Sequence, residues 1–299
     1  MDAEDHKPHG EFELAGVVAI DDSGTPGVAP KSLSLHAERK TWAAVIVPPA
    51  AIARLRRALE MFIDGVRGDY GVDELHFTDI YNGRHAFKNI EVEKRYELID
   101  LMTNMFGAFK LPILIQTCSP EHLAEIRAEM ANWHVKIPWF KLDNHEHVAL
   151  LFLLCQVRMF IREQSKLLPL PVPVIIDEGL QKSGNELSMP GWADLFAGGR
   201  ATFRSSNQSH FLQLADFAAF VVARVQWIAS AGISKHRDRE FLKIVSPERL
   251  WVVNLPNAVM SANENSAGEY ERILQADRLL KELPLSPGWQ GSFVKAKGP

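Results

Sequence analysis

Four acidic residues interrupt stretches of the chain that are otherwise apolar or structured: Asp21, Glu74, Asp177 and Asp216. Moving a carboxylate out of water is costly unless a cation or a hydrogen-bond donor compensates it. Carboxylates that are brought together also repel one another and raise each other's pKa. If the fold gathers these four side chains, we expect a cation between them.

Carboxylate oxygens are the ligands that Mg²⁺ and Mn²⁺ prefer in proteins. Two such ions about 3.5 to 4 Å apart can activate a water molecule and stabilise the leaving oxygen when a phosphodiester is cleaved. We therefore predict that Asp21, Glu74, Asp177 and Asp216 are metal ligands and catalytic residues, with Mg²⁺ or Mn²⁺ as the cofactor, in two copies. The alternative for each acid is a structural role, such as stabilising a turn or the N-terminus of a helix.

Three neighbouring residues are candidates for secondary roles. Asp22 and Glu178 each directly follow one of the four acids, so the sequence leaves open which member of each pair faces the metal. We favour Asp21 over Asp22, and Asp177 over Glu178 because it comes directly after an apolar run. His76 could orient a water molecule or contact the substrate, although a single histidine is more often a structural hydrogen-bond donor.

Candidate substrate contacts come from three cations near the predicted site: Lys182, Arg200 and Arg204. They fall in segments predicted to be rich in loops, where they could bind phosphates. Solvated loop charges are the commoner outcome. The sequence contains no Walker or dinucleotide-binding glycine pattern and no recognisable nucleophile triad, which disfavours nucleotide-cofactor and covalent mechanisms.

The elements that would position the acids follow from the apolar pattern. The runs 17–20 and 172–176 predict two buried strands, and each is followed by paired acids. Residues 212–228 are apolar almost all round and predict a buried helix. The first turn of that helix places Gln213 and Asp216 on one face.

Three further segments are predicted to be extended. Residues 41–47 (TWAAVIV) predict a strand that pairs with the first one as an antiparallel hairpin. The segment 68–83 alternates polar and apolar residues around Glu74, which predicts a short extended stretch. Residues 203–206 predict an edge strand.

The motifs IDDSG, ELHFTDIYNG, VIIDE and LQLADFAAF occur in this order. Over about residues 16 to 225 the chain resembles the bacterial proteins grouped as domain of unknown function 3800. IDDSG departs from that family's usual I-D-E-S-G at Asp22. The resemblance implies a ribonuclease H-like fold, in which acids on the first strand, an intermediate segment, a later strand and a late helix surround two metal ions. Asp21, Glu74, Asp177 and Asp216 occupy these positions here.

Composition limits the class of protein. The chain has 299 residues, of which 46% are hydrophobic, and a formal net charge of −4, so it can bury a large core but does not bind nucleic acid through overall basicity. Its two cysteines form no disulfide framework, which predicts a reducing, cytoplasmic location. The polar N-terminus does not resemble a signal peptide, and no apolar run approaches the length of a membrane span.

We therefore predict an α/β fold with a ribonuclease H-like mixed sheet flanked by helices and with helical insertions. Residues 16–255 form this domain, between a disordered tail (1–15) and a helical extension and tail (256–299). The predicted function is metal-dependent cleavage of DNA or RNA, with a bacterial defence role suggested by the resemblance. A non-catalytic module that binds nucleic acid or protein is the main alternative. The predicted partners are a nucleic acid and no membrane, with a protein partner or a second copy of the chain left open.

Overall fold

The computed structural model describes residues 15–23, 38–72, 74–130, 139–164, 168–231, 236–246 and 249–253. The predicted tail and C-terminal extension therefore fall outside the described residues, apart from residue 15, and the domain boundaries stay predictions. The helices are α1 (Pro49–Tyr70), α2 (Phe77–Asn82), α3 (Val92–Phe109), α4 (Pro120–Met130), α5 (His145–Glu163), α6 (His210–Ala231) and α7 (His236–Ile244). Short 3₁₀ helices cover His85–Phe87, Pro190–Trp192, Ala197–Gly199 and Ser206–Gln208.

The described strands form one mixed sheet in the order β5-β6-β4-β1-β2-β3-β7. β1 pairs antiparallel with β2, and β2 with β3, whereas β4 runs parallel to β1 and β6 runs parallel to β4. At the two edges, β5 is antiparallel to β6 and β7 is parallel to β3. The strands are β1 (Val17–Asp22), β2 (Lys40–Val47), β3 (Pro112–Cys118), β4 (Val174–Asp177), β5 (Glu186–Ser188), β6 (Arg200–Arg204) and β7 (Trp251–Val252).

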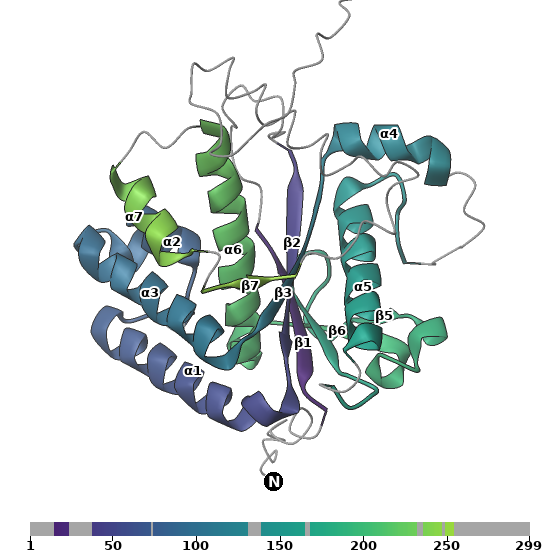
Figure 1. The fold of residues 1–299 in the computed structure, drawn as a ribbon, viewed down its shortest axis with the longest axis horizontal. Helices are drawn as coiled ribbons and strands as arrows, with labels where there is room; N and C mark the ends of the chain where they lie inside the picture. The colour runs from purple at the N-terminus through teal and green to yellow at the C-terminus, as the bar shows by residue number, and fades with distance from the viewer. Residues whose placement is uncertain are drawn as a thin grey trace, which may run out of the picture.

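Helices cover both faces of the sheet (Figure 1). α1, α3 and α6 lie on one side, and α5 lies on the other. The first strand serves both layers, because Val17 and Ala19 pack with α6 while Val18 and Ile20 pack with α5. A strand that is buried on both faces reads as an unbroken apolar run. The predicted fold class, an α/β domain with a mixed sheet flanked by helices, is confirmed.

Strands β1 and β4 bring two of the acids close together, because each acid lies at the carboxyl end of its strand. They are parallel neighbours, with Ile20 opposite Ile176, so the next residue of each strand is an aspartate. Carboxyl ends of adjacent parallel strands are a common place for functional groups in α/β folds. The predicted hairpin of residues 41–47 with the first strand is confirmed as the antiparallel β1–β2 pair.

Two predictions about extended segments are wrong. Residues 68–83 contain the end of α1 and the whole of α2, whose buried residues Phe77, Ile80 and Tyr81 follow helical spacing. The predicted edge strand at 203–206 is instead β6, which ends at Arg204 and lies inside the sheet. The three-residue strand β5 takes the edge position.

Helix α6 is the core helix on its side of the sheet. By length and composition alone, its stretch His210–Ile228 is apolar enough to cross a membrane, the one such stretch among the described helices, and 61% of it is buried inside the molecule. It packs on β1 and β2. The apolar composition of α6 is therefore explained by its position between the sheet and the outer helices.

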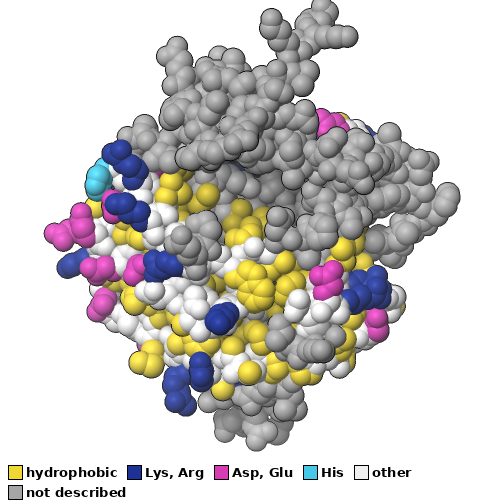
Figure 2. All heavy atoms as spheres, in the orientation of Figure 1, with side chains coloured by type: hydrophobic (Ala, Val, Ile, Leu, Met, Phe, Trp, Pro, Cys, Tyr) yellow, Lys and Arg dark blue, Asp and Glu magenta, His cyan; other side chains and the backbone are white. Residues whose placement is uncertain are grey.

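The surface drawn in Figure 2 carries charges of both signs. Acidic and basic side chains are interspersed over the outer helices α1, α3 and α7, and apolar side chains gather near the middle, where β7 lies. Trp251 and Val252 of β7 are 45% and 47% exposed. The described residues on this face therefore form no continuous basic surface.

Candidate metal site

The alternation of side chains along β1 separates Asp21 from Asp22. Asp21 has the same parity as Val17 and Ala19, which places its carboxylate on the side covered by α6, where it is 9% exposed. Asp22 points to the opposite side, where its Oδ2 lies 2.5 Å from Lys40 Nζ. The Asp22 backbone N–H also donates to Asp21 Oδ1 at 2.6 Å.

Asp177 is the last residue of β4 and shares the parity of Ile175, which packs on the same side as α6. Its Oδ1 is buried and has no hydrogen-bond partner. Burial, followed by repulsion from Glu74, raises the pKa of Asp177 to about 7. A buried carboxylate oxygen that accepts no hydrogen bond is expected where the carboxylate binds a cation.

Asp216 lies in the second turn of α6, the helix that packs on β1 and β2. Its Oδ2 accepts a hydrogen bond from the Phe77 backbone N–H at 3.3 Å. Burial raises the pKa of Asp216 to about 7. The hydrogen bond from Phe77 opposes this shift, and the charges of Asp177 and Glu74 add to it.

Asp21 is subject to the same forces. Burial raises its pKa well above the usual value, and Asp216, Asp177 and Asp22 add to the shift in that order. Asp21, Asp177 and Asp216 form no ion pair within the described part of the chain. Among the described residues, these carboxylates are thus gathered without a cationic side chain paired to them.

Glu74 comes from the non-helical stretch that precedes α2. Ser206 Oγ donates a hydrogen bond to Glu74 Oε1. The charge of Glu74 acts on both Asp177 and Asp216, so this acid belongs to the same group. Among the four predicted acids, it is the one that is on neither a helix nor a strand.

These residues fit a divalent cation by their chemistry. The group offers hard oxygen ligands, one orphaned carboxylate oxygen at Asp177, and pKa values that a bound cation would lower. As the side chains stand, no three His, Cys, Asp or Glu residues in the described ranges form a group arranged to hold one metal ion. The described part of the site therefore offers carboxylate oxygens but no closed coordination shell.

The predicted secondary residues lie at the rim. His76 is exposed, and its Nε2 is 4.0 Å from Glu74 Oε2. Glu178 is also exposed and accepts a hydrogen bond from the Ser183 backbone N–H at 3.3 Å, which stabilises the loop after β4.

The three predicted phosphate contacts separate into two groups. Arg204 ends β6 opposite Asp177, and Lys182 is exposed in the loop between β4 and β5. Arg200 begins β6, roughly 13 Å from Arg204 along the strand, and pairs with Glu186 at 3.1 Å. The structure brings Arg204 and the Lys182 loop toward the acids and leaves Arg200 outside the group.

Sequence reasoning assigned no role to three residues that contact the predicted ones or the backbone beside them: Lys40, Ser206 and Gln213. A lysine at the start of a buried strand is a detectable signal, since an ionised side chain there needs a partner. The spacing of Gln213, three residues before Asp216, places both on one helical face. Ser206 gave no signal, because its 3₁₀ turn is too short to predict.

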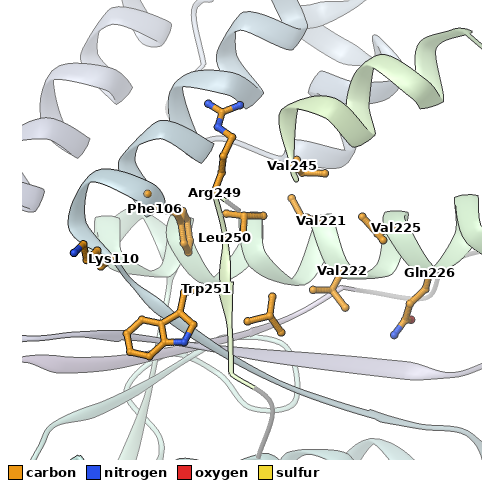
Figure 3. Close-up of a pocket in the computed structure, with 12 residues that line it drawn as sticks. Phe106, Lys110, Val221, Val222, Val225, Gln226, Val245, Arg249, Leu250 and Trp251 are labelled. Atoms are coloured by element: carbon orange, nitrogen blue, oxygen red, sulfur yellow. The ribbon is translucent and has the colours of Figure 1, made fainter. Parts of the chain in front are cut away.

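A separate apolar pocket of about 620 Å³ lies between α3, α6 and β7. Figure 3 shows Val221, Val222 and Val225 of α6 facing it together with Trp251. Gln226 lines it as well, and its buried Oε1 has no hydrogen-bond partner. No acidic residue lines this pocket, so it is distinct from the carboxylate group.

No protein-family model matches the chain, and no curated protein matches it. Among solved structures, the chain is similar to a crystal structure of Bst-RNase HIII in complex with Mn²⁺, with 14% sequence identity and a TM-score of 0.28. The match covers 82% of this chain and 76% of that one. With so low a TM-score, conclusions about function rest on the acids of this chain.

Proposed function

We propose that the chain is a Mg²⁺- or Mn²⁺-dependent phosphodiesterase with a ribonuclease H-like fold, and that it is a nuclease cleaving DNA or RNA. The observation that supports this most directly is the gathering of Asp21, Asp177 and Asp216, whose pKa values are raised by burial and mutual repulsion. Protons held by such a group exchange for divalent ions at neutral pH.

Asp21, Glu74, Asp177 and Asp216 would hold the ions. Mg²⁺ or Mn²⁺, when bound, supplies a water molecule of lowered pKa and positive charge for the phosphoryl oxygens. The chain's own part is to fix the ligands, because Asp21 and Asp177 end adjacent strands and Asp216 is on a buried helix. The Asp22 carboxylate pairs with Lys40 on the opposite side of the strand, which favours Asp21 as the ligand.

Substrate would approach over the rim of this group. Lys182 and Arg204 are the proposed phosphate contacts, because both lie beside the end of β4. His76 is exposed next to Glu74 and is placed to contact a water molecule or the substrate. A cytoplasmic role in bacterial defence is part of the proposal and comes from the family resemblance alone.

The test is cleavage of labelled single- and double-stranded DNA, RNA and an RNA–DNA hybrid, with Mg²⁺, Mn²⁺ or a chelator. We expect metal-dependent cleavage by the wild type and a loss of more than about 100-fold in Asp21→Asn and Asp216→Asn, because a lost ligand costs at least as much as a lost outer-shell partner. Asp64→Asn is the matched control, since Asp64 is exposed on α1 and pairs with Arg67 at 2.9 Å.

Cleavage that survives in both site variants, or its absence in the wild type with every substrate, would refute the nuclease proposal. A wild type that binds nucleic acid without cutting it would identify the non-catalytic module instead.

A further inference from the structure

The stretch from Glu74 to Phe77 is attached to α6 and to the 3₁₀ turn before it. Three hydrogen bonds make the attachment: Ser206 Oγ to Glu74 Oε1, Leu75 N–H to Gln213 Oε1 (2.9 Å) and Phe77 N–H to Asp216 Oδ2 (3.3 Å). Residues that are more than 120 positions apart in the chain are thereby fixed side by side.

Gln213 lies at the centre of this attachment. Its side chain is 2% exposed, and Leu75 is 1% exposed, so their hydrogen bond is shielded from water. A buried backbone N–H needs an acceptor, and water does not reach this one to replace Gln213. The position of the backbone next to Glu74 therefore depends on the Gln213 side chain.

Glu74 depends on such support more than the other acids do. Asp21 and Asp177 are held by strand pairing and Asp216 by its helix, whereas Glu74 lies on no regular element. Gln213 is one helical turn before Asp216, so the same turn of α6 that carries one acid fixes the backbone beside another.

We propose that Gln213 is a positioning residue, which acts through the Leu75 backbone to hold Glu74 beside the other three acids. This inference rests on the proposed function, because it assigns Gln213 a role in assembling the metal site.

The test compares Gln213→Met with Gln226→Met. Both substitutions remove a side-chain amide from α6, but Gln226 lines the apolar pocket, and its Oε1 has no hydrogen-bond partner (Figure 3). Amide hydrogen exchange of Leu75 reports the hydrogen bond directly, without any metal or substrate. Calorimetric titration with Mn²⁺ reports the assembly of the site.

In Gln213→Met we expect Leu75 to exchange at least about 10-fold faster and Mn²⁺ to bind about 10- to 100-fold more weakly, the usual effect of losing an outer-shell partner. Gln226→Met should match the wild type in both measurements. Gln213→Glu keeps an acceptor oxygen at the same reach and should recover the protection of Leu75. Should Gln213→Met fail to fold, Gln213→Asn, which is one methylene shorter, takes its place in both measurements.

If Gln213→Met matches Gln226→Met in Leu75 exchange and in Mn²⁺ affinity, the positioning role is wrong, while Mn²⁺ binding by the wild type leaves the proposed function standing. A wild type that binds no Mn²⁺ overturns the proposed function, and this inference with it.

Discussion

Among single residues, Asp21 and Asp22 show how a strand gives two adjacent carboxylates different environments. The side-chain period of two sends Asp21 to the α6 layer and Asp22 to the α5 layer, where Lys40 neutralises it. Lys40 Nζ also lies 4.0 Å from Glu146 Oε1 and 5.8 Å from the centre of the Trp42 ring. The lysine therefore occupies a mostly buried position in which it forms a close ion pair with Asp22.

Replacing Lys40 should show how much this ion pair contributes to stability. We expect Lys40→Met to lower the free energy of unfolding by about 3 kcal/mol, because it removes one member of a mostly buried ion pair. Adding Asp22→Asn to Lys40→Met should recover much of the loss, since both charges of the pair are then removed. Urea denaturation of the single and double variants measures both effects.

The exposed pair Arg67–Asp64 provides the comparison, and Arg67→Met should cost no more than about 1 kcal/mol. A double variant as unstable as the sum of its two single variants would show that Lys40 and Asp22 do not interact.

Between elements, the ends of β1 and β4 and the start of α6 create a group that titrates near neutral pH. The pKa values of Asp177 and Asp216 are raised to about 7 from an ordinary value of 3.8. Between about pH 4 and pH 7 the folded protein therefore keeps protons that the unfolded chain has already released. Stability from this source is complete below pH 4 and is lost as the pH rises through 7.

Metal-free protein should consequently melt at a lower temperature at pH 8 than at pH 5, because its carboxylates are then ionised in a buried place and repel one another. Saturating Mn²⁺ should reduce this difference, since bound ions replace the lost protons. Asp216→Asn, which removes one charge, should also show a smaller difference than the wild type. Scanning calorimetry with a chelator or with Mn²⁺ makes the comparison.

A metal-free wild type that gains stability from pH 5 to pH 8, with Asp216→Asn behaving identically, would contradict the raised pKa values.

The elements that sequence could predict are the ones with long apolar runs. β1, β2, β4 and α6 were predicted from their runs of apolar residues. The three strands bury nearly every residue, and 61% of the apolar stretch of α6 is buried. α2 was missed because six residues are too few for a clear helical period, and the alternation from Glu74 to Phe77 resembles a strand. β5 was missed because three residues carry no pattern, and β6 was then misplaced at the edge.

The sequence was sufficient to predict which acids belong to the candidate site, but not which side chains contact them. Asp21, Asp177 and Asp216 were detectable as acids in apolar contexts, and the structure places them together. The contacts that Lys40, Ser206 and Gln213 make with Asp22, Glu74 and the Leu75 backbone were not predicted, because each joins distant parts of the chain. Arg200 illustrates the limit for loop cations, since only strand register reveals that it lies at the far end of β6.

In the molecule as a whole, the four acids are distributed from residue 21 to residue 216, and every layer of the described fold contributes to their position. A fragment that ends at residue 205 lacks α6 and with it the cover over β1, so we expect it to bind no Mn²⁺. Calorimetric titration of that fragment beside the full chain is the check. Binding of equal affinity by the fragment would show that α6 is dispensable.

The parallel pairing of β1 with β4 has a consequence for the time when the chain is being made. At typical rates of translation, roughly 10 to 40 s separate the start of synthesis from the emergence of residue 216. Until then the first aspartate lacks the helix that covers it, and before residue 177 emerges it also lacks the strand β4. A ribosome is surrounded by nucleic acid. If the protein is the proposed nuclease, every copy whose synthesis has not yet reached α6 lacks Asp216 and is inactive.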